Sequence, residues 1–255
     1  MHLFNYAFTV LDSVDSTNNY AMAKVHAGLA KHGDGWYAKQ QTGGKGQRGK
    51  KWHTGEGDNI AMSIVIEPSR LLISEQFQLS AAVALACFDF FSGYAGSDTK
   101  IKWPNDIYWR DRKAGGILIE NVIGKPGKEK HHNRSKWKYA IAGIGININE
   151  TEFDRSISNA VSLKQITGNH FQPEELAREL QQKVLKKIDA LFNYPFQEIL
   201  DEYNGNLYKI NQPVRLKKSN IKFETIVKGV TPAGQLYTTD RIDNFFDFGE
   251  VEWVL

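Results

Sequence analysis

The pattern of apolar and polar positions predicts alternating strands and helices along most of the chain. Short apolar segments bounded by turn residues predict strands over residues 8–14, 35–41, 59–67, 100–103, 107–109, 115–122 and 139–148. The third of these segments alternates clearly, with apolar side chains at Ile60, Met62, Ile64 and Ile66.

Helical spacing and capping residues predict helices between and after these strands. Asp15, Ser16 and Thr17 offer an N-cap for a short helix that continues to about residue 30. Ser74 is the expected cap of a long helix that ends near Phe91. Two further helices are expected at the segment that begins with Pro173 and over 196–203. In the first of these two, apolar residues recur at helical spacing, at Leu176, Leu180, Val184 and Ile188.

The pattern changes after about Leu207. From there on, short strands alternate with turns, over residues 213–218, 223–230, 234–240 and 245–254. Such a series predicts a small β-barrel-like module. We therefore divide the chain into residues 1–206 and residues 207–255.

Composition narrows the class of protein. The formal net charge of +3 does not by itself indicate a nucleic-acid-binding protein, because much of the basic excess lies in two local segments. The single cysteine, Cys87, excludes a disulfide within the chain and favours a reducing compartment. Cys87 could act as a nucleophile, but its apolar neighbours favour a small buried residue.

No targeting or membrane segment is expected. The N-terminal residues lack the charged start and small-residue cleavage pattern of a signal peptide. No stretch reaches the roughly 18 uninterrupted apolar residues of a membrane span. The expected location is the cytoplasm.

The segment from Gln41 to Trp52, QTGGKGQRGKKW, is the strongest candidate for a ligand-binding loop. It contains four glycines and four cationic side chains, so it cannot form part of a core. Glycines allow the backbone N–H groups to approach a ligand, and lysine and arginine suit phosphate or another anion. The alternative is a solvated surface loop. The segment is neither a GxxxxGK[ST] P-loop nor a dinucleotide-binding fingerprint.

A second set of polar residues follows from two predicted turns. Asn105 and Asp106 lie in a Pro-Asn-Asp turn, and Lys113 opens a glycine-led strand, so that an amide, a carboxylate and an ammonium group can converge. Simpler accounts are an Asx-turn for Asp106 and a solvated hairpin charge for Lys113. Asn147, at the end of another strand, could also reach a ligand.

The basic segment 125–138 is expected to be an insertion between two strands. It contains the pair His131 and His132, which could suggest a metal site. Because no carboxylate or thiolate is spaced to complete such a site, we expect both histidines to face solvent.

Five motifs in order resemble those of biotin protein ligases. They are DSTNNYA (15–21), QTGGKGQRGKKW (41–52), KWPNDIYW (102–109), KAGGILIEN (113–121) and AGIGININ (142–149). With the C-terminal β module, the resemblance covers nearly the whole chain. It implies an α+β fold, in which a mixed sheet with helices, like that of class II aminoacyl-tRNA synthetases and biotin ligases, precedes an SH3-like β-barrel. The first motif begins at Asp15, so the expected type is the ligase without a DNA-binding domain, and no DNA partner is expected.

The resemblance also implies a reaction in two steps. Biotin attacks ATP to form biotinyl-5′-AMP, and a lysine of a biotin carboxyl carrier protein then accepts the biotinyl group. Cationic side chains and Mg²⁺ are needed because two anions must meet. A homodimer is compatible with the resemblance, which does not require one.

The matching motif positions imply the following roles. The residues that resemble biotin contacts are Ser16, Thr17, Asn18, Gln41, Lys45, Gly46, Gln47, Lys113, Gly115 and Gly116. Those that resemble contacts to ATP or the adenylate are Lys45, Gln47, Arg48, Trp52, Asn105, Lys113 and Asn147. The candidates for catalysis are Lys113, Arg48 and Asp106. Asp106 is also the candidate Mg²⁺ ligand and the candidate acceptor of the proton from the carrier lysine.

The sequence of the glycine-rich loop departs from the family pattern. The family usually has GRGRxG where this chain has GKGQRG, over residues 44–49. Gln47 therefore replaces a cation expected to hold the intermediate, and Arg48 or Lys50 could compensate. We expect weaker retention of biotinyl-AMP if they do not.

Two alternative functions remain. One is a lipoate protein ligase, which would use a different carboxylate, and the other is a nucleic-acid-binding regulator that uses the basic segments.

Overall fold

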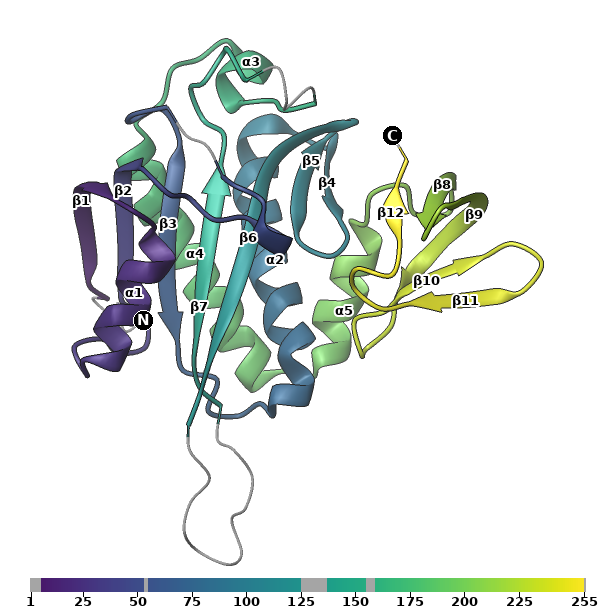
Figure 1. Cartoon of the computed structure of the whole chain (residues 1–255), viewed down its shortest axis with the longest axis horizontal. Coiled ribbons are helices and arrows are strands. Elements are labelled where there is room, and N and C mark those ends of the chain that lie inside the picture. The colour runs from purple at the N-terminus through teal and green to yellow at the C-terminus, as the bar shows by residue number, and fades with distance from the viewer. Residues whose placement is uncertain (1–5, 53–54, 125–136, 155–158, 255) are drawn as a thin grey trace, which may run out of the picture.

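Seven strands form one mixed sheet in the first part of the chain (Figure 1). The computed structural model describes residues 6–52, 55–124, 137–154 and 159–254. The strands are β1 (Phe8–Val14), β2 (Gly35–Gln41), β3 (Ile60–Ile66), β4 (Thr99–Lys102), β5 (Asp106–Trp109), β6 (Arg112–Ile123) and β7 (Trp137–Ile146), in the spatial order β1-β2-β3-β7-β6-β5-β4. Only β1 and β2 pair in parallel within this sheet.

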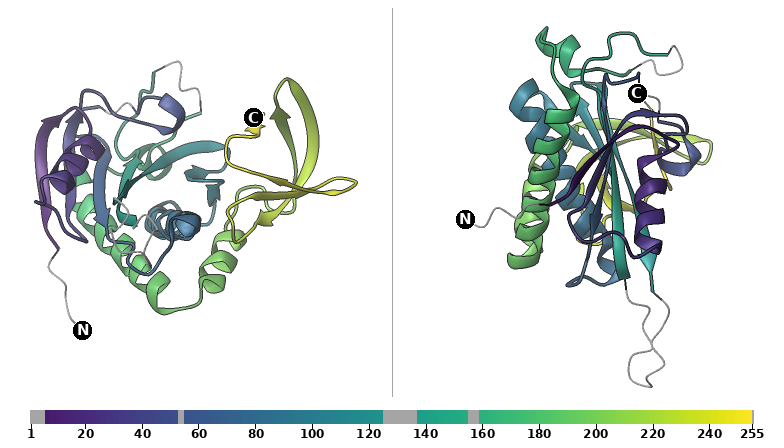
Figure 2. Two further views of the ribbon diagram at one scale, coloured as in Figure 1. Left: turned by 60° about the horizontal axis from the view of Figure 1, so that its bottom comes forward. Right: turned by 90° about the vertical axis from the view of Figure 1, so that its left-hand side faces the viewer.

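Helices cover both faces of this sheet. One face packs against α2 (Gln76–Ala95) and α4 (Pro173–Asn193), and the other carries α1 (Thr17–His26) (Figure 2). The helix α5 (Phe196–Gly205) leads from α4 to the C-terminal module, while the short α3 (Leu163–Thr167) lies near one end of the sheet. The predicted mixed sheet with helices is therefore confirmed.

The strand β3 is buried on both faces. Ile60, Met62 and Ile64 belong to the main core under α2 and α4, whereas Val65 belongs to a second cluster under α1. All seven residues of β3 are buried. The alternation in its sequence therefore does not separate a buried face from a solvated one, because small or apolar residues also fill the α1 side.

The long helix α2 lies inside the protein. Among the described residues, this one helix is long and apolar enough to cross a membrane. Its side chains nevertheless pack against the sheet and α4. Its start differs from the prediction: Ser74 does not cap it, because residues Ile73–Glu75 form a separate 3-10 turn and α2 begins at Gln76. Cys87 is fully buried, and this burial raises the pKa of its thiol, which makes it a core residue.

The other helices follow their sequence signals with small shifts. Pro173 opens α4, and the four predicted apolar positions of this helix are buried. The helix α1 ends at His26, earlier than expected, and Ser16 occupies its N-cap position without a side-chain capping bond. The sequence prediction missed α3, whose N-terminus is a capping box between Ser162 and Gln165.

A second, five-stranded antiparallel sheet forms the C-terminal module. Its strands are β8 (Pro213–Lys218), β9 (Ile221–Val230), β10 (Leu236–Thr239), β11 (Asp243–Phe246) and β12 (Glu252–Trp253), in the order β11-β10-β9-β8-β12. The module contacts the first part of the chain, where Trp103 Nε1 donates to the carbonyl of Gly234 at 2.9 Å. A small β module is thus confirmed, while the domain boundary at residue 206 stays a prediction.

The basic segment predicted over 125–138 falls mostly outside the described residues. The histidines His131 and His132 belong to that undescribed part. Its last two residues, Trp137 and Lys138, are the first residues of β7.

Candidate active site

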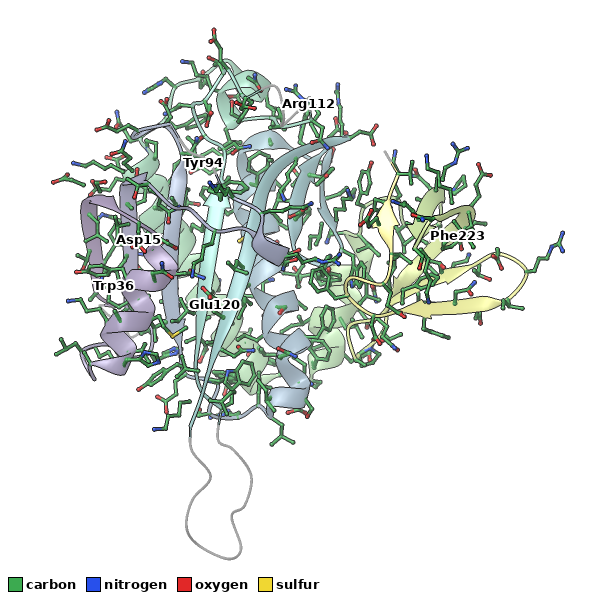
Figure 3. The ribbon with its side chains drawn as sticks, in the orientation of Figure 1. Asp15, Trp36, Tyr94, Arg112, Glu120 and Phe223 are labelled. Atoms are coloured by element: carbon green, nitrogen blue, oxygen red, sulfur yellow. The ribbon has the colours of Figure 1, made fainter. Side chains whose placement is uncertain are left out.

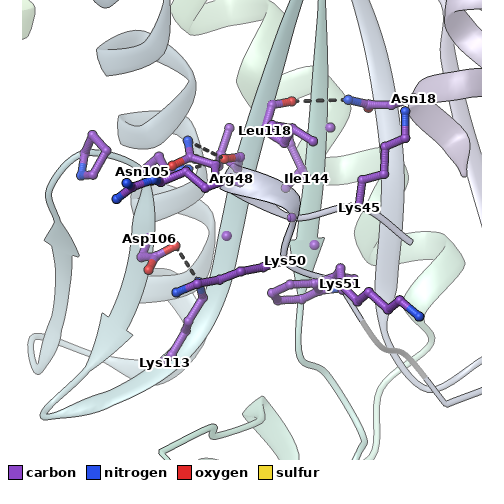
Figure 4. A pocket seen from close by; sticks show the side chains of 18 of the residues that line it. Asn18, Lys45, Arg48, Lys50, Lys51, Asn105, Asp106, Lys113, Leu118 and Ile144 are labelled. Atoms are coloured by element: carbon purple, nitrogen blue, oxygen red, sulfur yellow. Dashed lines mark hydrogen bonds and ion pairs between the residues drawn. The ribbon is translucent and has the colours of Figure 1, made fainter. Parts of the chain in front are cut away.

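A cavity of about 680 Å³ lies between the seven-stranded sheet, the loop over residues 41–52 and the C-terminal module. It is lined by all the predicted site residues except Gly115 and Asn147. Figure 4 shows that the labelled side chains come from several elements far apart in sequence.

The loop over residues 41–52 is a tight hairpin. The amide of Gly46 donates to the carbonyl of Lys50 at 2.7 Å, and that of Trp52 donates to Gly44 at 2.9 Å. A Cβ on Gly44 would lie 2.2 Å from the carbonyl oxygen of Trp52, so this position requires glycine. Arg48 sits at the tip with φ 56°, a left-handed conformation. The hairpin crosses in front of the sheet (Figure 1), where it can cover a ligand.

The cationic and amide side chains of this hairpin point to different partners. Lys45 donates to Asn19 and lies 3.9 Å from a carboxylate oxygen of Glu120. Gln47 Nε2 lies 3.4 Å from the carbonyl of Ile117. The guanidinium group of Arg48 lies against Gly249 of the C-terminal module, which brings the hairpin tip to the second sheet.

One end of the cavity carries a buried network of hydroxyl and amide groups. The backbone amide and hydroxyl of Thr17 donate to Gln41 Oε1 at 2.8 and 3.1 Å. The hydroxyl of Ser63 lies 2.7 Å from Thr17 Oγ1 and 2.6 Å from Asn18 Oδ1. Asn18 in turn donates to Glu120 at 2.7 Å. Such groups can both donate and accept, which suits a neutral polar ligand group.

Two glycines of β7 make room for side chains above the sheet. A Cβ on Gly143 would lie 2.3 Å from Asn18 Oδ1, and a Cβ on Gly145 would lie 2.3 Å from the ring of Trp52. The indole therefore rests directly on the backbone of β7. Its Nε1 is buried on the side of Gly145 and has no hydrogen-bond partner among the described residues.

Asp106 and Lys113 form an ion pair at the other end of the cavity. Lys113 Nζ donates to Asp106 Oδ1 at 2.6 Å, and both side chains are less than one third exposed (Figure 4). A Cβ on Gly116 would lie 3.3 Å from each of these two atoms. The absence of a side chain at position 116 thus leaves the space in which the pair meets.

The two predicted residues that do not line the cavity, Asn147 and Gly115, lie in the backbone segments next to it. Asn147 is buried, and its Nδ2 donates to the carbonyl of Val161 at 3.2 Å and lies 3.4 Å from that of Lys113. Gly115 pairs with Ile146, and a Cβ there would lie 2.9 Å from the carbonyl of Gly145. In this structure both residues fix the backbone around Lys113.

Asn105 lines the cavity beside Asp106 (Figure 4). Its side chain is buried and donates to the carbonyl of Ile117. Gln47 points to the same carbonyl. The amide of Asn105 therefore fixes the turn before β5 and so helps to place Asp106.

Several lining residues were not found from the sequence. Lys102 is buried and its Nζ lies 3.0 Å from the hydroxyl of Tyr108. Ser63 does not line the cavity itself but is hydrogen-bonded to Thr17 and Asn18, which do, and it was likewise not predicted. The C-terminal module contributes a wall whose members lie about a hundred residues or more from the other motifs and have no recognisable pattern: Phe248, Gly249, Val251, Glu252 and Trp253.

The donor set fits Mg²⁺ only as part of a nucleotide complex. The described residues contain no group of three or more acidic, histidine or cysteine side chains that could hold a metal. Asp106, the expected ligand, has one oxygen paired with Lys113. Mg²⁺ commonly keeps several waters and binds through one or two carboxylates together with substrate phosphates. Asp106 would be the carboxylate in such an arrangement.

Comparison with known proteins gives the family. The model of the biotin/lipoate A/B protein ligase family matches residues 10–138, about half of the chain. The chain belongs to this family. The matched segment includes the hairpin, Asp106 and Lys113, so the cavity is built largely from the family's own region.

Individual relatives agree with this assignment. The bifunctional ligase/repressor BirA of Escherichia coli is 28% identical over 235 residues, which cover 89% of this chain and 67% of BirA. The biotin–[acetyl-CoA-carboxylase] ligase of Paracoccus denitrificans is also 28% identical over 235 residues, covering 89% of this chain and 92% of that ligase. The structure of a biotin protein ligase from Aquifex aeolicus with biotin and ATP has a TM-score of 0.79, with 23% identity and coverage of 97% and 98%. The similarity to this solved structure supports the fold described above.

Proposed function

We propose that this protein activates biotin with ATP to form biotinyl-5′-AMP and transfers biotin to a lysine of a carrier protein. The observation that supports this most directly is the layout of the cavity. A network of hydroxyl and amide groups around Thr17 and Gln41 lies at one end, and the Asp106–Lys113 pair lies at the other. A ligand with a polar uncharged head and a carboxylate at the end of a chain fits this layout.

The first step joins two anions. A carboxylate oxygen of biotin attacks the α-phosphorus of ATP, the bond to the β-phosphate oxygen breaks, and pyrophosphate leaves with the electron pair. Lys113 is held at the cavity by its bond to Asp106 and by backbone bonds from its own amide and carbonyl to Asn159 and Val161. A fixed ammonium group of this kind stabilises the negative charge that develops on the phosphoryl oxygens. Mg²⁺, bound with the nucleotide, supplies further positive charge.

The second step transfers the biotinyl group. The amine of the carrier lysine attacks the acyl carbon, the bond to the phosphate oxygen breaks, and AMP leaves. The amine must lose a proton, and Asp106 is the carboxylate beside the reacting end of the cavity. The hairpin and the C-terminal module both line the cavity, where they would shield the mixed anhydride from water.

The partner follows from this chemistry. The acceptor is a biotin carboxyl carrier protein or domain with an exposed lysine, and no DNA partner is needed for the reaction.

We place the reaction in the cytoplasm, where ATP and a reduced cysteine are both expected. A homodimer is compatible with this function, and nothing in the reaction requires one.

The experiment that tests the function has two parts. Biotin-dependent exchange of labelled pyrophosphate into ATP measures the first step, with lipoate in place of biotin as the control substrate. Transfer of labelled biotin to a purified carrier domain, with and without ATP, measures the second. Exchange that depends on lipoate and not on biotin would overturn the proposal in favour of a lipoate ligase.

A further inference from the structure

Lys102 is a buried cation that none of these roles uses. It is the last residue of β4, stands opposite Asp106 in the sheet and is 8% exposed. Its side chain nevertheless lines the cavity. Its Nζ lies 3.0 Å from the hydroxyl of Tyr108, 4.6 Å from the centre of the same ring and 5.4 Å from that of Trp253.

No carboxylate neutralises this ammonium group directly. Among the described residues, Lys102 forms no ion pair, and the one carboxylate that acts on it, Asp106, is bonded to Lys113. A buried ammonium group without an anionic partner is costly, and neutral aromatic rings offset only part of that cost. The site therefore favours the arrival of an anion.

The charges around Lys102 also favour the binding of an anion. Lys113 and Lys50 both repel the positive charge of Lys102. Glu252 also lines the cavity but lies 3.9 Å from Lys217. Burial lowers the pKa of Lys102 to about 8, Asp106 opposes this shift, and Lys113 and Lys50 add to it. Ammonium groups that are held together despite their repulsion create a strongly positive field for a polyanion.

We propose that Lys102, together with Lys50 and beneath Trp253, forms the subsite that holds the β- and γ-phosphates of ATP and then the leaving pyrophosphate. The assignment rests on the proposed function. With the α-phosphate at Lys113, the rest of the triphosphate extends past Asp106 toward Lys102 and the C-terminal module. When the bond between the α-phosphorus and the bridging oxygen breaks, the electron pair goes to that oxygen, which leaves as part of pyrophosphate. The Lys102 ammonium group donates a hydrogen bond to this leaving pyrophosphate.

The test uses the reverse of the first step. Preformed biotinyl-AMP is mixed with enzyme and inorganic pyrophosphate, whose oxygen attacks the α-phosphorus and releases biotin, giving ATP. The variants are Lys102→Met, which keeps the length and removes the charge, and Lys102→Arg, which keeps the charge. Lys100→Met is the matched control, because Lys100 lies on the same strand and does not line the cavity.

For Lys102→Met we expect the KM for pyrophosphate to rise about 10- to 100-fold, the usual effect of losing a hydrogen bond from a charged group. Biotin affinity and transfer from preformed biotinyl-AMP to a carrier domain, which involve no pyrophosphate, should stay within about twofold. Lys102→Arg should recover most of the pyrophosphate affinity, and Lys100→Met should resemble the wild type.

An unchanged KM for pyrophosphate in Lys102→Met would overturn the subsite. A wild-type protein without any biotin-dependent exchange would instead overturn the proposed function, so the two failures are distinguishable.

Discussion

Lys113 Nζ and Asp106 Oδ1 are 2.6 Å apart, and a Cβ at position 116 would touch both atoms. The pair thus meets in a space that a side chain at position 116 would crowd. The backbone of Lys113 is also bonded on both sides, to Asn159 and Val161. The ammonium group is therefore fixed at the cavity before any ligand binds, as electrostatic catalysis requires.

Replacing Lys113 by alanine should lower biotin-dependent pyrophosphate exchange by about 10²- to 10³-fold, the usual effect of removing one fixed donor to a developing charge. Because Lys113 is partly exposed, the fold should remain, which circular dichroism would show. The exposed Lys186→Ala variant is a suitable control and should exchange at the wild-type rate. Near-wild-type exchange in Lys113→Ala would show that another group stabilises the phosphoryl charge.

Replacing Asp106 by asparagine should slow the transfer of biotin from preformed biotinyl-AMP to a carrier domain. The amide keeps the size of the side chain but cannot accept the proton of the incoming amine. A single-turnover assay at several pH values measures this step without the first one. Transfer at the normal rate would remove Asp106 from the role of proton acceptor and leave it as the partner of Lys113.

Replacing Gln47 by arginine should slow the release of biotinyl-AMP roughly tenfold or more, since a charged donor contributes about 1.5–3 kcal/mol where an amide contributes about 1. In the present chain the Gln47 amide lies 3.4 Å from Ile117, and Arg48 contacts the C-terminal module, so neither is committed to the intermediate. Stopped-flow dissociation would measure the rate. Gln182→Arg, which adds the same charge on the exposed face of α4, is the control. Equal rates would mean that Arg48 or Lys50 already compensates.

The parts of the site that the sequence predicts are those built from local motifs. Turn residues place Asp106 beside Lys113 because β5 and β6 pair next to each other in the chain. The glycine-rich segment is predicted as a ligand loop for a similar reason, since its composition excludes a core. The class of fold follows from the order of the elements together with the resemblance to a family.

The remaining parts depend on long-range packing. Trp253 reaches the cavity from the far end of the chain, and Lys102 becomes a buried cation only because Tyr108 and Trp253 enclose it. Asn147, expected at the ligand, turns toward Val161 instead. No local pattern specifies these contacts, because each is set by how two distant elements meet.

Replacing Gly145 by alanine should weaken ATP binding more than biotin binding. The added Cβ would lie 2.3 Å from the ring of Trp52 and would push the indole away from β7, whereas the network around Thr17 lies elsewhere in the cavity. Calorimetric titration with biotin, and with ATP in the presence of a biotin analogue that cannot react, would separate the two affinities. Gly205→Ala is the control, because a Cβ there meets no atom within 4 Å. An equal loss of both affinities would contradict a role for Trp52 on the nucleotide side.

Replacing Gln181 by methionine should lower the free energy of unfolding by about 1–3 kcal/mol, because the carbonyl of Gly33 would lose its donor inside the protein and that of Ala7 would keep only the amide of Gly35. Gln181 is buried on α4, and its Nε2 donates to the carbonyls of Gly33 at 2.7 Å and Ala7 at 3.0 Å. It thereby ties the helix to the segments that precede β1 and β2. Urea unfolding would measure the change, with the exposed neighbour Gln182→Met as the matched control. If both variants were equally stable, the carbonyl of Gly33 would have to find another donor, and the amide of Gln181 would not be what joins α4 to this edge of the sheet.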